Sequence, residues 1–151
     1  MVDKQKWQEL LKKKGLRITK QRLAILSLLE KSTRPLAAGK IFAALKKEFP
    51  DIRLSTVYRN LNEFEEKKML RKFNLDFKKN KSYFELLTAR EHHHHLICVS
   101  CEEIIPLGCP ADYMSKLKEE TGYDILEHKL KVYGICNKCQ KAEDIDFNGA
   151  G

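Results

Sequence analysis

The chain has 151 residues, 42% of them hydrophobic and 33% charged, a balance typical of folded proteins. It contains no run of about 18 apolar residues, and its first residues are charged and amphipathic, so the sequence predicts neither a membrane span nor a signal peptide. We therefore expect a cytoplasmic protein whose five cysteines stay reduced and are better suited to metal binding than to disulfides.

Charge is distributed unevenly along the chain. Residues 1–90 carry 23 Lys and Arg against 10 Asp and Glu, whereas residues 91–151 carry 6 against 11, giving net charges of +13 and −5. A basic half joined to an acidic half favours two domains, and the basic half indicates a polyanionic partner such as nucleic acid. A solvated lysine-rich surface is the alternative that charge alone leaves open.

Hydrophobic residues recur at helical spacing three times before residue 50. The first helix is expected around Trp7 and can end at Gly15. The second begins after Thr19, a suitable N-cap, and the third lies between Pro35 and Pro50.

A fourth helix is expected after Ser55, with Val57, Leu61 and Phe64 on its inner face and polar residues in its first turn. A short turn between two helices of this kind is the helix-turn-helix layout, in which the second helix enters the major groove of DNA. There Arg can pair with guanine and Asn with adenine. An ordinary exposed helix face is the alternative. The candidate DNA contacts, including the start of the second helix, are Arg17, Thr19, Lys20, Arg22, Ser55, Thr56, Tyr58, Arg59 and Asn60.

The segment from 73 to 87 predicts a β-hairpin. Phe73, Leu75 and Phe77 alternate with polar residues, residues 78–81 form a basic turn, and residues 83–87 return as the second strand. A lysine-rich hairpin behind a helix-turn-helix is the wing of a winged helix, placed to meet phosphates.

The second half predicts a small α+β unit. Strands are expected at 96–98 and 104–105, a helix from Pro110 at its N1 position toward Gly122, and an alternating strand over 123–133. A unit of about 60 residues is marginally stable unless an ion, a disulfide or a partner supports it.

Two Cys-x-x-Cys pairs, Cys98/Cys101 and Cys136/Cys139, supply four soft ligands for one tetrahedral zinc. The 34 residues between the pairs must contain folded structure. Redox dithiols are the alternative reading of the pairs. The fifth thiol, Cys109, is an inert small residue, a redox-reactive thiol or a stand-in metal ligand.

Four consecutive histidines, His92 to His95, precede the first cysteine pair. On a strand they alternate, so His92 and His94 face one way and His93 and His95 the other, and one run can serve two sites. Glu85 precedes the run on the hairpin, and His128 is expected on a later strand. An expression tag, or histidines that are merely exposed, are the simpler alternatives.

Four segments together carry a resemblance that covers nearly the whole chain: residues 15–22 (GLRITKQR), 54–61 (LSTVYRNL), 92–101 (HHHHLICVSC) and 133–139 (YGICNKC). They resemble the ferric uptake regulator (Fur) family of metal-dependent transcriptional regulators. The resemblance implies a homodimer with a winged-helix DNA-binding domain at 1–87, a hinge at 88–91, and an α+β dimerisation and metal-binding domain at 92–151.

The resemblance also implies three metal sites. The structural zinc maps onto Cys98, Cys101, Cys136 and Cys139. The hinge sensor site maps onto Glu85, His93 and His95, and two further usual ligands are replaced, one by Arg34 or its neighbour Pro35 and one by Pro106. The third site maps onto His92, His94 and His128, with Asp112 as the nearest carboxylate.

We therefore expect a sequence-specific DNA-binding repressor of metal homeostasis or oxidative-stress genes, with structural Zn²⁺ and a second divalent metal, Fe²⁺, Mn²⁺ or Zn²⁺. The effector is left open between these metals and peroxide. The sequence shows no paired catalytic carboxylates, nucleophile–base constellation or phosphate loop, so no enzyme is expected. The alternatives are a zinc-dependent thiol redox protein and a zinc-stapled interaction module without sequence-specific DNA binding.

Overall fold

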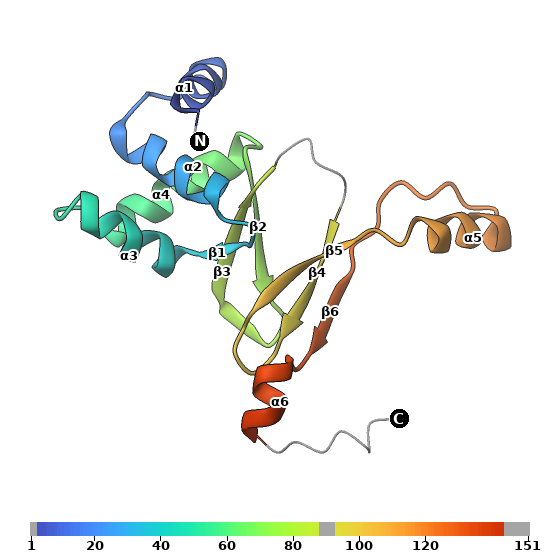
Figure 1. Cartoon of the computed structure of the whole chain (residues 1–151). Helices are drawn as coiled ribbons and strands as arrows, with labels where there is room; N and C mark the ends of the chain where they lie inside the picture. Colours follow the sequence, from blue (N-terminus) through green and yellow to red (C-terminus); the bar gives the residue numbers. More distant parts are fainter. Residues whose placement is uncertain (1–2, 88–92, 144–151) are drawn as a thin grey trace. The chain divides into compact units, whose positions relative to one another are not determined.

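The computed structural model describes residues 3–87 and 93–143, and the chain divides into two compact units, Met1–Arg90 and Glu91–Gly151 (Figure 1). The expected hinge at 88–91 lies outside the described residues. Each unit is described by itself.

The first unit combines four helices with a small antiparallel sheet (Figure 1). Strand order in the sheet is β1-β3-β2, so the hairpin strands β2 and β3 pair with each other and the short strand before the third helix pairs with β3. The elements are α1 (Lys4–Lys13), α2 (Lys20–Lys31), β1 (Leu36–Ala37), α3 (Ala38–Glu48), α4 (Leu54–Glu66), β2 (Leu70–Leu75) and β3 (Lys78–Leu86).

Helix ends in this unit follow from local chemistry. Thr19 caps α2, because its Oγ1 accepts a hydrogen bond from the Arg22 N–H at 3.2 Å, as the sequence predicts. Gly15 takes φ +71° in the turn after α1, a conformation that glycine adopts without steric cost. The prediction that Ser55 caps α4 is wrong: the helix begins at Leu54, and Arg53 is its N-cap with no side-chain cap bond.

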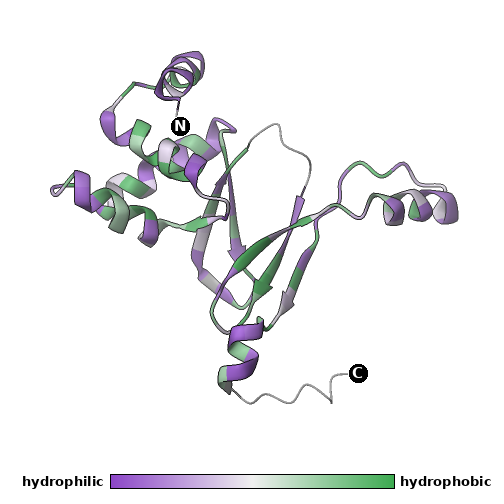
Figure 2. Ribbon diagram, in the orientation of Figure 1, coloured by the Kyte–Doolittle hydropathy of each residue, from purple (hydrophilic) through white to green (hydrophobic). Residues whose placement is uncertain are grey.

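The core of the first unit lies between the helices and the sheet. Figure 2 shows green hydrophobic segments on the facing sides of the helices and purple segments on their outer sides. Apolar residues from all four helices meet residues from the hairpin in a single cluster. Its buried members include Trp7, Leu11, Ile25, Leu26, Ile41, Leu45, Val57, Leu61, Phe64, Leu70 and Phe84. The helical stripes seen in the sequence are therefore core stripes, and α4 is held rigidly by its inner face.

The second unit is a three-stranded sheet of order β5-β4-β6 with two helices. The central strand pairs antiparallel with β5 and parallel with β6. The parallel pairing aligns Cys98 with Gly134 and so brings the second Cys-x-x-Cys pair beside the first. The elements are β4 (His93–Cys98), β5 (Ile104–Gly108), α5 (Ala111–Thr121), β6 (Lys131–Gly134) and α6 (Asn137–Glu143).

Two sequence expectations differ from the structure of this unit, and one helix was not expected. The strand predicted over 123–133 is confined to Lys131–Gly134, which pairs with His95–Cys98 of β4, and residues 123–130 pair with no strand of the described residues. Pro110 lies at the N-cap of α5, one position earlier than expected, and Gly122 ends that helix at φ +74°. The helix α6, which contains Cys139, was not predicted from the sequence.

No helix among residues 3–87 and 93–143 has the length and apolar content that crossing a membrane requires.

Candidate nucleic-acid interface and metal centres

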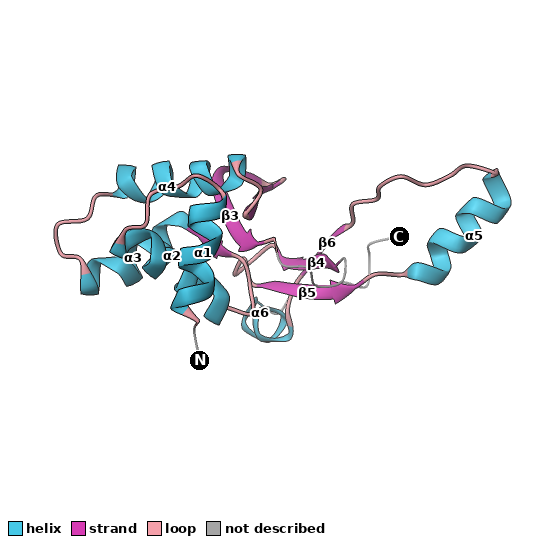
Figure 3. Ribbon diagram, turned by 90° about the horizontal axis from the view of Figure 1, so that it is seen from above, coloured by secondary structure: helices cyan, strands magenta, loops and turns pink. Residues whose placement is uncertain are grey.

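The helices α3 and α4 form a helix-turn-helix (Figure 3). The turn is closed from both sides: the Ile52 N–H donates to the Phe49 carbonyl at 3.0 Å, and Lys46 Nζ reaches the Ile52 carbonyl at 3.4 Å. These bonds fix the angle at which α4 leaves the turn. Its inner face is buried, and one outer face stays exposed along the first two turns.

The exposed face of α4 carries Ser55, Tyr58, Arg59 and Asn62. Three of these belong to the predicted DNA contacts. Asn62 is absent from the predicted DNA contacts, although it follows Tyr58 by four positions and therefore shares its helix face. A serine, a tyrosine, an arginine and an asparagine on one face can donate to and accept from base edges.

Asn60 is a correction to the predicted contacts, because its side chain points inward and is only 5% exposed. Its Oδ1 accepts from Arg22 Nε at 3.0 Å, and its Nδ2 donates to the Thr56 carbonyl at 3.0 Å. Both ends of the amide are thus used within the unit, so Asn60 is not free to read a base.

Arg22 is a second correction, because its guanidinium is used inside the unit. Besides Asn60 it contacts Glu63 through an ion pair, and it donates to the Arg17 carbonyl at 3.2 Å. Arg22 therefore fixes α2 against α4. Its neighbours Arg17 and Lys20 are exposed near the start of α2, while Thr19 serves as the cap described above.

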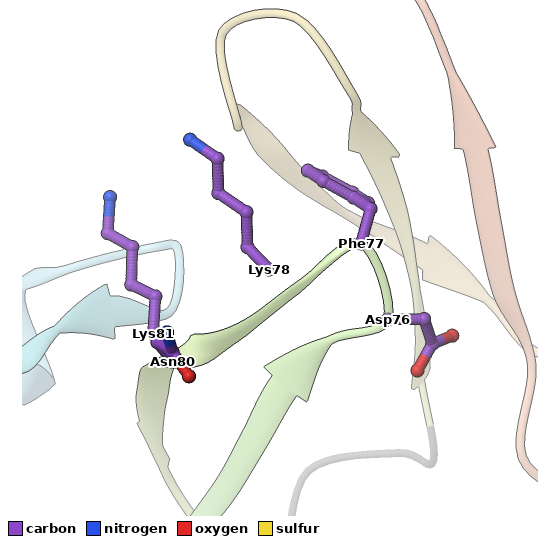
Figure 4. A pocket seen from close by; sticks show the side chains of 5 residues that line it. All are labelled: Asp76, Phe77, Lys78, Asn80 and Lys81. Atoms are coloured by element: carbon purple, nitrogen blue, oxygen red, sulfur yellow. The ribbon is translucent and has the colours of Figure 1, made fainter.

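The lysine-rich hairpin differs in detail from the prediction. Asp76 and Phe77 form the turn, and Lys78 already begins β3. The pairing is irregular here, since Leu75 faces Lys78 while Asn74 faces Ser82, and the extra residues of β3 bulge outward. Figure 4 shows the side chains of Lys78 and Lys81 pointing to the same side of this tip, away from Asp76. The tip is therefore cationic, as expected of a wing.

The four cysteines of the two pairs converge in the second unit, with all four sulfurs within 4.8 Å of one another. The sulfurs of Cys101 and Cys136 are 3.8 Å apart. A tetrahedral zinc with Zn–S bonds of about 2.3 Å has S–S edges of about 3.8 Å, so this spacing matches a zinc tetrahedron. The residues present therefore fit one zinc ion, which would cross-link the end of β4 to the segment after β6.

Backbone groups favour the thiolate form of Cys98. Although burial acts to raise it, hydrogen bonds with the backbone of Cys101, Cys136 and Ser100 lower the pKa of Cys98 from 9.0 to about 6. The Cys136 N–H lies 3.3 Å from the Cys98 sulfur. A thiolate is the form of cysteine that binds metal.

The outer cysteines behave oppositely, because several sulfurs share one small volume. Despite a hydrogen bond with Ser100 that acts to lower it, the neighbouring thiols of Cys136, Cys101 and Cys98 raise the pKa of Cys139 to about 12. Although a hydrogen bond with the Glu103 backbone acts to lower it, partial desolvation and the thiols of Cys98 and Cys136 raise the pKa of Cys101. Four thiolates at this spacing need a cation.

The histidine run alternates on β4 as predicted. The rings of His93 and His95 contact each other edge to face, with centroids 5.2 Å apart. His94 points to the other face and meets His128, with Nε2 atoms 3.0 Å apart. His92 lies outside the described residues.

Cys109 completes the cluster around His94. The sequence predicts a carboxylate ligand in this place. Its sulfur lies 3.1 Å from Nε2 of His128, and the donor atoms of His94, Cys109 and His128 lie within 4.8 Å of one another. Asp112, the expected fourth ligand, is exposed in the first turn of α5 and is not part of this group. The prediction that His128 lies on a strand is wrong, because this residue precedes β6.

The expected hinge ligands come from both units. Glu85 lies on β3 opposite Arg71, whose NH1 is 3.6 Å from its Oε1. His95 lies opposite Pro106 in the β4–β5 pairing, so its cross-strand neighbour offers no ligand atom. The Arg34 carbonyl accepts from Ser32 Oγ at 2.6 Å in the bend before β1.

A winged helix with a polar recognition face, followed by an α+β unit whose cysteines fit zinc, defines the class of metal-binding transcriptional regulators. The sequence profile of the Ferric uptake regulator family matches residues 13–133. The chain belongs to this family, and it is a regulator of transcription.

Relatives with two kinds of function match this chain over most of their length. The ferric uptake regulation protein of Neisseria gonorrhoeae is 37% identical over 133 residues, which cover 86% of this chain and 90% of the relative. The peroxide operon regulator of Bacillus subtilis is 36% identical over 138 residues, covering 90% and 92%. The solved structure of the Helicobacter pylori ferric uptake regulator matches with a TM-score of 0.79, 27% identity and 92% of each chain covered.

Proposed function

We propose that the chain is a homodimeric, metal-responsive repressor that reads an operator with α4 and works in the cytoplasm. The observation that carries the proposal is that one unit has a polar helix face suited to DNA and the other has clusters of metal ligands. The first presents Ser55, Tyr58, Arg59 and Asn62 on one exposed helix face, and it also carries a cationic hairpin tip. The second gathers cysteine and histidine ligands in tight clusters.

Support for a dimer comes from the apolar surface of the second unit. Among its described residues only Ile97, Cys98 and Ile104 are buried hydrophobics. Many large apolar side chains are exposed instead, including Val99, Ile105, Tyr113, Tyr123, Leu126, Leu130 and Val132. A second copy of the chain would cover such a surface, and a two-fold dimer would place two copies of α4 against two half-sites of a palindrome.

The regulatory cation is proposed to bind beside the histidine strand. Glu85, His93 and His95 are the proposed hinge ligands, and His92, His94 and His128 contribute to the second dimer-domain site. Fe²⁺, Mn²⁺ and Zn²⁺ all accept such ligands. Relatives support the choice of effectors, since solved structures include a zinc-bound manganese uptake regulator, and curated relatives include a peroxide operon regulator.

A cation shifts a conformational equilibrium only by its difference in affinity for the two states. We therefore propose that the metal-bound chain favours the arrangement of its two copies of α4 that fits the operator. A coupling of this kind is typically worth 5- to 150-fold in affinity, on the order of 1–3 kcal/mol.

The test begins with DNA sequences selected by the zinc-loaded protein from a random duplex pool. Fluorescence anisotropy then measures the affinity for the selected duplex and for a scrambled one, with metal chelated and with Zn²⁺, Mn²⁺ or anaerobic Fe²⁺ added. We expect at least about tenfold tighter binding to the selected duplex with one of these metals. Failure to enrich any sequence would contradict the regulator. Equal affinity under all four conditions would contradict only its control by metal.

A matched pair of variants tests the hinge ligands. Glu85→Ala should reduce the metal-dependent gain in DNA affinity, whereas Arg71→Ala removes only the side chain opposite Glu85 and should keep that gain. An undiminished gain in Glu85→Ala would remove this carboxylate from the regulatory site.

A further inference from the structure

We propose that Cys109 is the thiolate ligand of the cation site at His94 and His128, and that this thiolate makes the site prefer Zn²⁺ to Mn²⁺ or Fe²⁺. The proposal deepens the proposed function by naming ligands and metal, and it rests on that function only for its regulatory meaning. The ligands come from three segments of the second unit: β4, the turn before α5, and the segment before β6.

The three donor atoms converge as a metal site requires. Nε2 of His128 lies 3.0 Å from Nε2 of His94 and 3.1 Å from the sulfur of Cys109. Around a tetrahedral zinc the corresponding N–N and N–S edges are about 3.4 and 3.6 Å. Outward movement of a few tenths of an ångström therefore suffices to place an ion between them.

A hydrogen-bonded cluster is the simpler reading, and it leaves one contact poorly satisfied. Nε2 of His128 has either one proton or one lone pair in the ring plane, so it can make one well-aligned hydrogen bond. Two polar atoms nevertheless lie at bonding distance from it. A cation at the centre would bond to all three donors at once.

A backbone hydrogen bond to His94 has to be given up when an ion binds. The Leu130 N–H donates to Nδ1 of His94 at 3.2 Å, which orients the ring and points its Nε2 toward His128. When Nε2 binds a cation, the ring proton belongs on Nδ1, and the hydrogen bond from Leu130 is lost. Ion binding therefore replaces this backbone hydrogen bond, and the hydrogen bonding between the three side chains, by three coordinate bonds.

The donor set decides the metal. Thiolate and imidazole ligands suit Zn²⁺, whereas carboxylate-rich sites suit Mn²⁺. In this cluster sulfur replaces the expected carboxylate, since Asp112 is exposed and outside the group. His94 is buried, while Cys109 and His128 are half-buried, so the site is accessible to ions and yet partly desolvated.

The experiment uses the full chain with its four-cysteine site filled by zinc, without DNA. Co²⁺ is added as a spectroscopic probe, because bonding to a thiolate gives a sulfur-to-cobalt charge-transfer band and tetrahedral geometry gives intense visible bands. Competition with Zn²⁺ and Mn²⁺ then ranks the metals. The variants are Cys109→Ala, Cys109→Asp and, as matched control, Asp112→Ala.

We expect one Co²⁺ with a charge-transfer band per chain, besides any Co²⁺ without this band at Glu85, His93 and His95, and we expect Zn²⁺ to displace it at far lower concentration than Mn²⁺. Cys109→Ala should lose the band and at least about tenfold in affinity, Cys109→Asp should bind without the band and accept Mn²⁺ more readily, and Asp112→Ala should match the parent. Zinc content of one per chain in every variant confirms that the fold is kept.

Two results would overturn the proposal: a charge-transfer band that survives in Cys109→Ala, or loss of binding in Asp112→Ala with full binding in Cys109→Ala. Because no DNA is present, failure here leaves the proposed repressor untouched, and failure of the operator test leaves this site untouched.

Discussion

Arg22 and Asn60 join two helices of the first unit through their side chains: Arg22 Nε on α2 donates to Asn60 Oδ1 on α4 at 3.0 Å. The same amide donates to the Thr56 carbonyl one turn earlier in α4. The bond orients the recognition helix from behind, while its exposed face stays available for a partner.

Replacing Asn60 is therefore expected to affect stability first. Asn60→Ala leaves a part-buried guanidinium without one acceptor, which should lower the free energy of unfolding by about 1–3 kcal/mol. Urea denaturation followed by circular dichroism measures this loss. Asn62→Ala, two positions along on the exposed face, is the control and should change stability by no more than about 0.5 kcal/mol. Equal stabilities for the two variants would contradict the inward role of Asn60.

Replacing Arg59 should have the opposite profile. Its side chain is exposed on α4, so Arg59→Ala should keep the unfolding midpoint of the parent. Loss of a base contact should weaken binding to the selected operator by about 1–3 kcal/mol and relax the preference at one base position. Lys116→Ala removes an exposed cation from α5 and serves as the charge control. An operator affinity as high as that of the parent would show that Arg59 does not contact DNA.

The hairpin tip should contribute affinity without specificity. A Lys78→Ala, Lys81→Ala double variant should weaken binding to selected and scrambled duplexes alike, because lysines at a wing meet phosphates. The slope of log affinity against log salt concentration should fall by about 2, one unit for each lost phosphate contact. A salt titration of DNA binding measures the slope, and an unchanged slope would place the tip away from the DNA backbone.

Loss of one ligand from the four-cysteine cluster should unfold the second unit. Cys98→Ser removes the buried sulfur at the end of β4, and structural zinc contributes on the order of 10 kcal/mol or more to small domains. We expect a chain without tightly held zinc and without dimer, measured by native mass spectrometry. Cys109→Ala should keep the zinc of this cluster. A zinc-loaded dimer of Cys98→Ser would rule out the stabilising role.

Zinc binding to the same cluster should depend on pH in two regimes. The pKa of Cys98 is lowered to about 6, so this residue is already a thiolate at pH 7 and releases a proton on zinc binding only below about pH 6. Those of Cys101 and Cys139 are raised, so both thiols lose protons when zinc binds at neutral pH. The logarithm of zinc affinity should thus rise by at least about two per pH unit near pH 7, and more steeply below 6. Chelator competition between pH 5 and 8 measures both slopes.

Residue patterns were sufficient for the parts of the fold that rest on local periodicity. Stripes such as Val57, Leu61 and Phe64 predict the buried face of α4, and the structure confirms it. Alternation predicted a strand over 123–133, but Tyr123 is 74% and Leu126 97% exposed, because a strand also needs a neighbour to pair with. Alternation reports which residues share a face and says nothing of whether a neighbouring strand exists.

The ligand sets show the same division. Cysteine pairs at fixed spacing and histidines on one strand predict clusters that the structure brings together. Cys109 joins His94 because the chain after β5 turns back toward the segment before β6, a contact across 19 residues with no local signature. Asn60 was mistaken for a DNA contact because a polar side chain in a recognition helix looks the same in sequence whether it points outward or toward Arg22.

Because β4 pairs with β6, the four-cysteine cluster forms late in the folding of the second unit. Cys98 and Cys101 follow β4, whereas Cys136 and Cys139 follow β6, so no short segment of the unit contains all four thiols. Zinc can be bound by all four cysteines only after the chain has been made as far as Cys139 and β6 has paired with β4. Tight zinc binding therefore reports on folding. A chain that holds the ion has a fully folded second unit, whereas an incompletely folded chain binds zinc more weakly.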